Sequence, residues 1–205
     1  MQNKILYVIS KKRLIVSRIV GFLILLLLLF TGHSFKRQEI IDSLFKMSGL
    51  ILISICSFGR LWSLIYISGY KSNTLITEGP YSMVRNPLYF FTLLGAVGIG
   101  LASENVLVIA IIIIFYFLYY PVTILVEERK LAGRFGQTFA EYKRRVPMLV
   151  PKLSLYKEPE TYTITARQLL HNIAESLLLL WIFILLHLIE MLHNTGILPV
   201  LWKVP

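Results

Sequence analysis

Arginine and asparagine stand directly before a proline in the segment EGPYSMVRNPLYFF, residues 78–91, between two hydrophobic stretches. Pro87 is suited to the first position of a helix because it lacks an N–H group, which makes Asn86 the expected N-cap. Arg85 would then lie beside the free backbone N–H groups of a helix N-terminus, a combination that binds carboxylate or phosphate. The alternative interpretation is a tight interfacial turn with a snorkelling arginine and belt tyrosines.

A pair of acidic residues, Glu127 and Glu128, closes a long hydrophobic run. We expect the helix to end there, which would place both carboxylates at the negative end of the helix dipole, where they are unfavourable. One interpretation is local compensation by salt bridges to Arg129, Lys130 or Arg134. The other is that the carboxylates accept hydrogen bonds from ribose hydroxyls or bind a cationic ligand.

Hydrophobic segments must position these polar groups. The chain has 205 residues, of which 56% are hydrophobic, and a mean hydropathy of +0.70, which is unusual for a soluble domain. About 20 apolar residues cross a membrane as a helix. We therefore predict an all-α, polytopic membrane helix bundle of about five transmembrane helices, with spans at 15–30, 47–68, 88–102, 106–126 and 169–192. The first run is predicted to be a retained helix because no small-x-small cleavage site follows it.

The chain divides into three predicted parts: a basic arm with the first helix (1–48), a core with three transmembrane helices (49–151), and a linker with the last helix (152–205). Lys and Arg concentrate in the N-terminal arm and in the loops after the second and fourth spans, which five spans place on one side. The positive-inside rule assigns that side, with the N-terminus, to the cytoplasm, in a bacterial inner membrane. A group at Lys36, Arg37 and Lys46 opposes this orientation.

The formal net charge of +10 is explained by attraction to anionic lipid headgroups, so it does not indicate a nucleic-acid partner. The single cysteine, Cys56, lies inside the second span and is expected to be a small core residue. Three ionisable residues in the last span, Glu175, His187 and Glu190, can share one polar stripe, whereas His171 lies at the entry of the span and is expected to meet lipid headgroups. They show no metal-ligand spacing that recurs elsewhere, and we predict no metal site.

Four short motifs occur in order along the core: Gly79-Pro80-Tyr81, Arg85-Asn86-Pro87-x-Tyr89, Glu127-Glu128-x-x-Leu131 and Phe135-Gly136-x-x-Phe139-x-x-Tyr142. With the upstream Gly59, Arg60 and Trp62, this order and spacing resemble the isoprenylcysteine carboxyl methyltransferase and phospholipid methyltransferase family of membrane enzymes. The resemblance covers about half of the chain, from the second span to Pro151.

The resemblance implies S-adenosylmethionine as cofactor, held at the cytoplasmic mouth of the bundle. Arg85 suits its carboxylate, and the rings of Tyr81 or Tyr89 suit its sulfonium cation. Glu127 and Glu128 suit its ribose hydroxyls or amino group. These five residues are the predicted cofactor-binding set, together with two glycines considered next.

Gly98 and Gly100 belong to the segment GAVGIG, which has two interpretations. Small residues at this spacing let helices approach closely, and by resemblance the same glycines lie near the cofactor. We include both in the predicted cofactor site. The predicted catalytic residues are Arg85, Asn86 and Glu128.

Asn86 replaces the histidine that the family usually has at this position. Because asparagine does not take up a proton at neutral pH, it cannot act as a general base. Positioning alone supplies much of the rate of a methyl transfer, so we predict a lipid-like acceptor with a carboxylate or phosphate, which is already ionised at pH 7, or with a thiolate. The alternatives are an NADPH-dependent membrane sterol-reductase-like enzyme and a non-enzymatic membrane scaffold or carrier.

Overall fold

Apolar helices form the body of the computed structural model, which describes residues 12–33, 39–68, 74–161, 164 and 166–204. The elements are, in chain order, α2 (Arg13–Phe30), β1 (Thr31–His33), α3 (Glu39–Ser68), α4 (Pro80–Met83), α5 (Pro87–Ala102), α6 (Val106–Arg145), the 3-10 helix η1 (Leu153–Leu155), α7 (Ala166–Asn194) and β2 (Trp202–Val204). The predicted all-α membrane bundle is confirmed. Some basic residues used for the predicted orientation lie outside the described residues: Lys4, Lys11, Lys36, Arg37 and Lys71.

Each predicted span corresponds to a helix. Within the described residues, α3, α6 and α7 contain stretches long and apolar enough to cross a membrane, and α2 and α5 contain shorter apolar stretches, Ile15–Phe30 and Pro87–Ala102. A 16-residue helix such as α5 rises roughly 24 Å, less than a hydrocarbon core of about 30 Å. α5 begins at Pro87, as predicted.

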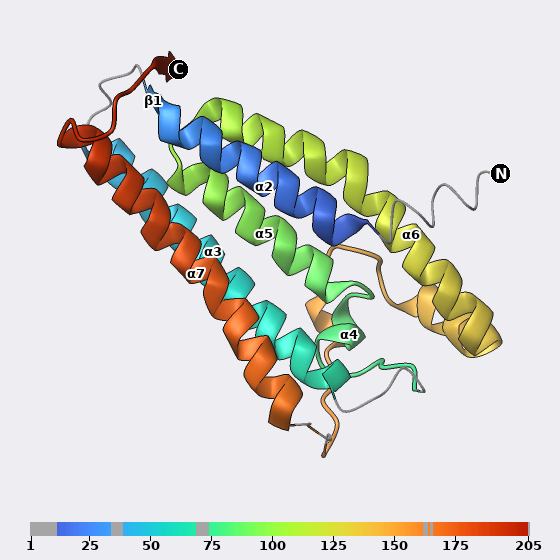
Figure 1. Cartoon of the computed structure of the whole chain (residues 1–205). Helices are drawn as coiled ribbons and strands as arrows, with labels where there is room; N and C mark the ends of the chain where they lie inside the picture. Colours follow the sequence, from blue (N-terminus) through green and yellow to red (C-terminus); the bar gives the residue numbers. More distant parts are fainter. Residues whose placement is uncertain (1–11, 34–38, 69–73, 162–163, 165, 205) are drawn as a thin grey trace.

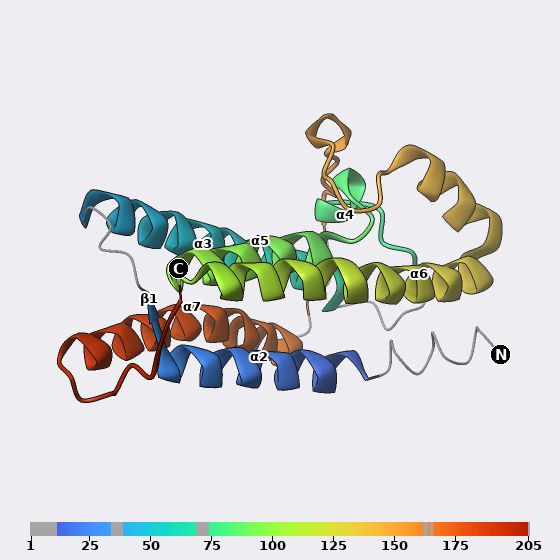
Figure 2. The ribbon, with the colours of Figure 1, turned by 90° about the horizontal axis from the view of Figure 1, so that it is seen from above.

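The helices form two layers. α3, α5 and α6 make one layer, and α2 and α7 lie in the other (Figures 1 and 2). At one end of the bundle the strands β1 and β2 pair in parallel, with Thr31 opposite Trp202. The opposite end carries α4, the last turns of α6 and the segment that leads to α7 (Figure 1). The motifs identified in the sequence meet at this second end.

Small residues allow α3 and α5 to pack closely. A Cβ added to Gly98 would lie 2.8 Å from the carbonyl oxygen of Gly49, and one added to Gly95 would lie 2.5 Å from the sulfur of Cys56. Cys56 is buried in this contact, which confirms its predicted place in the core. The glycines of α5 therefore bring its backbone against α3, as small residues do between membrane helices.

The predicted end of the fourth span at residue 126 is not the end of its helix. α6 continues to Arg145, and its path bends at Gly136, whose φ of 50° and ψ of −120° are non-helical. After the bend the chain turns back toward α4 (Figure 2). Phe139, Tyr142 and Val146 are buried in one cluster there. The helix extends past the span because its sequence is amphipathic there. Residues beyond 126 are too charged to span a membrane, yet they retain an apolar face that packs on the loops.

Replacing Gly136 with alanine is expected to destabilise the fold by about 1–3 kcal/mol, because a residue with a Cβ strongly disfavours this backbone conformation. A Cβ at this position would meet no other atom within 4 Å, so the effect comes from backbone strain alone. Gly133 is the matched control: it is helical and equally open, and Gly133→Ala should be neutral or stabilising by up to about 1 kcal/mol. Thermal unfolding in detergent measures both. Equal midpoints for the two variants would contradict the assigned bend.

Candidate active site

Arg85 joins the start of α5 to the end of α6. Its backbone N–H donates to the carbonyl of Pro147 (2.9 Å). Its Nη1 donates to the carbonyls of Lys143 (2.9 Å) and Val146 (2.7 Å). Arg85 thus fixes two distant segments of the chain to each other, and its predicted role as an anion binder stays a prediction.

The Glu128 carboxylate lies at the centre of this junction and is 4% exposed. Its Oε1 accepts hydrogen bonds from Arg85 Nε (2.8 Å) and Asn86 Nδ2 (3.2 Å). Lys143 Nζ lies 3.4 Å from Oε2, within ion-pair distance, yet Oε2 is buried and accepts no hydrogen bond from the described residues. The structure therefore brings the three predicted catalytic residues into direct contact and leaves one carboxylate oxygen with acceptor capacity.

The expected position of the acidic pair at a helix C-terminus is wrong, because α6 continues for 17 residues beyond Glu128 to Arg145. In the middle of a helix the dipole does not make the carboxylates of Glu127 and Glu128 unfavourable, so it gives no reason to expect a compensating positive charge. Glu128 is paired all the same, with Arg85 from the loop before α5 and with Lys143 from beyond the bend. These ion-pair partners of Glu128 are distant in sequence, unlike the local salt bridges to Lys130 or Arg134 that the sequence suggested.

Asn86 occupies the N-cap position of α5, as predicted, but its side chain makes no capping hydrogen bond. Its amide instead donates to Glu128 Oε1 and to the carbonyl of Met148 (3.1 Å). An amide N–H₂ group is a donor that carries no charge. Asn86 therefore holds the Glu128 carboxylate in place.

Tyr81 lies beside the same junction, in α4. The Tyr142 hydroxyl donates to its carbonyl oxygen (2.7 Å). Burial raises the pKa of the Tyr81 phenol, and the Tyr142 and Glu127 side chains raise it further, against a lowering by Arg60. The Tyr81 phenol is therefore neutral at physiological pH and retains its O–H donor. Glu127 and Arg60 are near enough for their charges to act on it.

Arg60 approaches from α3. Its Nη1 donates to Thr92 Oγ1 on α5 (2.7 Å), and the Thr92 hydroxyl donates in turn to the carbonyl of Leu88 (2.7 Å). α3 and α5 are thus joined by a polar bridge inside the bundle, about a turn and a half from the start of α5. From the sequence, Arg60 was recognisable only as part of the motif pattern.

An apolar cavity of about 400 Å³ lies between α2, α5, α6 and α7. Aliphatic and aromatic side chains line most of it, with hydroxyls from Ser17, Thr92, Tyr116 and Tyr120 and no charged side chain among the described residues. Thr92 connects this cavity to Arg60. The volume lies in the range of pockets that hold small molecules.

The remaining predicted cofactor residues lie in packing contacts. Tyr89 is buried in α5, with its ring against that of Tyr120 (5.6 Å between centroids). Gly98 packs on α3, and a Cβ on Gly100 would lie 2.9 Å from the Ile109 side chain of α6. Both glycines lie roughly 16–20 Å along α5 from Pro87. The structure gives them a packing role and does not bring them to Glu128, so their cofactor contact stays a prediction.

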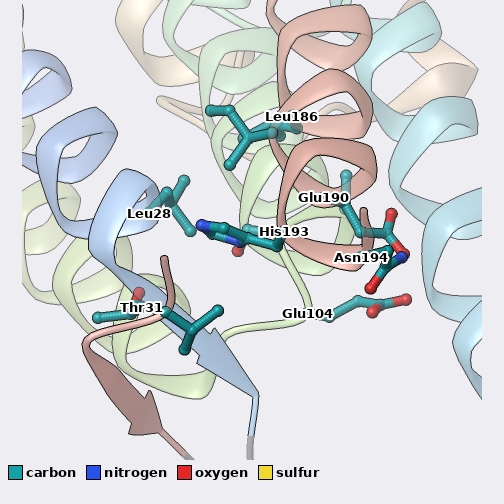
Figure 3. A pocket seen from close by; sticks show the side chains of 11 residues that line it. Leu28, Thr31, Glu104, Leu186, Glu190, His193 and Asn194 are labelled. Atoms are coloured by element: carbon teal, nitrogen blue, oxygen red, sulfur yellow. The ribbon is translucent and has the colours of Figure 1, made fainter. Parts of the chain in front are cut away.

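The ionisable residues of α7 lie elsewhere. His171 pairs with Glu175 on the exposed surface (3.2 Å). Glu190 pairs with Lys46 of α3 beside a pocket of about 150 Å³ at the end opposite the junction, where Glu104, Glu190 and Asn194 turn toward one another (Figure 3). The described residues contain no group of three His, Cys, Asp or Glu suited to a metal ion.

Sequence reasoning missed three participants, Thr92, Tyr142 as a donor to Tyr81, and Lys143. Tyr142 was visible only as a motif position. Thr92 and Lys143 carry no signal of their own, because a threonine in a span and a lysine in a basic loop are ordinary. Arg60 did carry a signal, since an arginine inside a membrane span is by default a functional candidate.

Comparison with known proteins identifies the same family that the sequence motifs resemble. The phospholipid methyltransferase family model matches residues 41–138. The cobalt-zinc-cadmium resistance protein CzcN of Cupriavidus metallidurans is 39% identical over 190 residues, 93% of this chain and 87% of that protein. The nickel-cobalt-cadmium resistance protein NccN of Alcaligenes xylosoxydans xylosoxydans is 34% identical over 197 residues, 96% of this chain and 92% of that protein.

Methanethiol S-methyltransferase 2 of Bradyrhizobium diazoefficiens is 40% identical over 87 residues, 42% of this chain and 31% of that protein. No solved structure shows significant similarity to the chain. The chain belongs to the isoprenylcysteine carboxyl methyltransferase and phospholipid methyltransferase family of membrane proteins.

Proposed function

We propose that this protein transfers a methyl group from S-adenosylmethionine to a small or lipid-like apolar acceptor that carries a thiolate, carboxylate or phosphate. The observation that carries the proposal is the junction at Glu128. A buried carboxylate is held by Arg85 and Asn86, keeps one oxygen able to accept hydrogen bonds, and lies at the same end of the bundle as Tyr81 and Glu127.

The residues at this junction fit the cofactor. Glu128 Oε2 is buried without a hydrogen bond from the described residues, and such an oxygen suits an ammonium or ribose hydroxyl donor. Glu127 lies on the adjacent position of α6 and is half-buried. When bound, S-adenosylmethionine supplies an electrophilic methyl group whose bonding electron pair returns to the sulfonium sulfur. The protein's part is to bind, orient and exclude water.

The acceptor's chemistry follows from the groups at the site. Asn86 is a hydrogen-bond donor here, and no histidine of the described residues is among the side chains that contact Glu128. An amine would have to lose a proton before reacting, whereas a carboxylate or phosphate is ionised at pH 7. The apolar cavity, which carries no charged lining, fits the body of such an acceptor.

The site end of the bundle carries three basic residues in the last turn of α6: Lys143, Arg144 and Arg145. Positive charge at a helix end favours the cytoplasmic face, and we place the site there, in a bacterial inner membrane. Two relatives that match nearly the whole chain are named for resistance to divalent metals. We place this protein in the same physiological setting, with methyl transfer as its contribution.

Binding of S-adenosylmethionine and, separately, of NADPH to the detergent-purified protein tests this function. Calorimetry should show saturable binding of S-adenosylmethionine and none of NADPH. Binding of NADPH alone would assign the protein to reductases, and binding of neither would favour a scaffold.

Replacing Ala96 with phenylalanine is expected to fill the cavity and raise the KM for hexanethiol at least about tenfold, with S-adenosylmethionine affinity unchanged, because Ala96 lines the cavity away from Glu128. Formation of S-adenosylhomocysteine measures the reaction. Ala110→Phe is the control, since Ala110 is exposed on α6 and does not line the cavity. Wild-type kinetics in Ala96→Phe would show that the acceptor binds elsewhere.

A further inference from the structure

Arg60 is a cation inside a membrane helix. It lies eight residues before the end of α3, roughly 12 Å along the axis. Arginine in such a position is costly, and it normally pairs with an anion or with several carbonyl groups. The contacts of Arg60 are therefore informative.

Those contacts are few. A guanidinium has five N–H donors, and within the described parts of the chain Arg60 makes one hydrogen bond, to Thr92 Oγ1. No carboxylate of the described residues lies within ion-pair distance of it. Arg85, by comparison, has an ion pair with Glu128 and two side-chain bonds to carbonyls. Of these two arginines, Arg60 is the one with donors available for a ligand.

Arg60 is linked to the apolar cavity through Thr92. The Thr92 hydroxyl accepts a hydrogen bond from the guanidinium, and Thr92 also lines the cavity, as do Ser17 and Tyr120. The charges of Arg60 and Glu127 both act on the Tyr81 phenol, so the guanidinium also lies near the proposed cofactor end. An acceptor whose body fills the cavity would have its polar end in this region.

We propose that Arg60 binds the ionised reacting group of the acceptor and thereby selects an organic monoanion with an apolar body. This inference rests on the proposed function. A guanidinium binds a carboxylate through paired hydrogen bonds. In a water-poor site it also favours the thiolate form of a bound thiol, whose proton is released to solvent water, so that ionisation needs no protein base. Arg60 is thus the group that offsets the absence of a histidine at position 86.

The first experiment measures binding of hexanoate, without S-adenosylmethionine, to the wild-type full-length protein and to Arg60→Met and Arg60→Lys by calorimetry. Arg60→Met should weaken binding roughly 10- to 100-fold, as expected for loss of hydrogen bonds to a charged group, and Arg60→Lys should restore part of it. Arg144→Met, an exposed arginine on α6, is the control and should bind as the wild type does. Equal hexanoate affinity in Arg60→Met and wild type would overturn the inference. This readout is independent of whether the protein binds S-adenosylmethionine, which tests the proposed function.

The second experiment compares the pH dependence of kcat with hexanethiol. The apparent pKa of the bound thiol should rise by about one to two units in Arg60→Met, because the cation that favours the thiolate is gone. A purely structural residue would not move this profile. If Arg60→Met instead lost affinity for S-adenosylmethionine and not for its decarboxylated analogue, Arg60 would bind the cofactor's carboxylate, and the inference would be wrong.

Discussion

Replacing Glu128 with glutamine is expected to abolish S-adenosylmethionine binding and to destabilise the protein by about 3–5 kcal/mol. The carboxylate is the ion-pair partner of the buried Arg85, and removing one member of a buried pair leaves an uncompensated charge. Thermal unfolding in detergent and calorimetric titration measure the two effects. Glu141→Gln is the control on the same helix, since Glu141 is exposed and should change neither quantity appreciably.

A double variant separates stability from function at this pair. Apolar residues of similar volume can replace a buried ion pair with little loss of stability. Arg85→Met combined with Glu128→Leu should therefore unfold closer to the wild-type temperature than Glu128→Gln, but should still bind no S-adenosylmethionine. Retained cofactor binding in the double variant would make the pair a structural element only.

Gly79→Ala is expected to destabilise the protein by about 3 kcal/mol or more, through two separate effects. Gly79 has a φ of 59° and a ψ of −134°, a conformation that costs another residue about 1–3 kcal/mol. Its Cβ would also lie 2.2 Å from the ring of Tyr66, which must move at a further cost of about 1–3 kcal/mol. Tyr66 donates to Glu158, so its displacement would loosen the segment that follows η1.

Gly196→Ala isolates the contribution of the backbone. Gly196 also has a positive φ, 73°, but its Cβ would meet no atom within 4 Å. We expect Gly196→Ala to cost about 1–2 kcal/mol, clearly less than Gly79→Ala. Equal unfolding temperatures for the two variants would show that the close packing of Tyr66 against Gly79 does not add to the cost of a side chain at position 79.

Helix positions were predictable because apolar runs of sufficient length define them, and Pro87 marked the start of α5. The end of α6 could not be predicted in the same way, because hydropathy falls at Glu127 while helix-forming sequence continues to Arg145. Gly136 lies in the recognised motif, yet only its φ shows that it bends the helix. The path after that bend determines which groups meet Glu128.

Motifs that occur together assigned Arg85, Asn86 and Glu128 to one predicted catalytic set. The sequence did not predict their other partners. The carbonyls of Lys143 and Val146 reach Arg85, and the Lys143 ammonium reaches Glu128, only because α6 reverses direction. Gly98 and Gly100 show the converse case. Their spacing suited two roles, and the packing of α5 against α3 and α6 accounts for both residues without a ligand.

The decisive experiment is transfer of the labelled methyl group of S-adenosylmethionine to hexanethiol, hexanoate and hexylamine by the purified protein. We expect S-adenosylhomocysteine and a methylated thiol or carboxylate with the wild-type protein, far less product with the amine, and none with Glu128→Gln. Methylation of the amine alone would contradict the role given to Asn86 and Arg60. No product with any of the three acceptors, from folded protein that does not bind S-adenosylmethionine, would contradict the proposed activity itself.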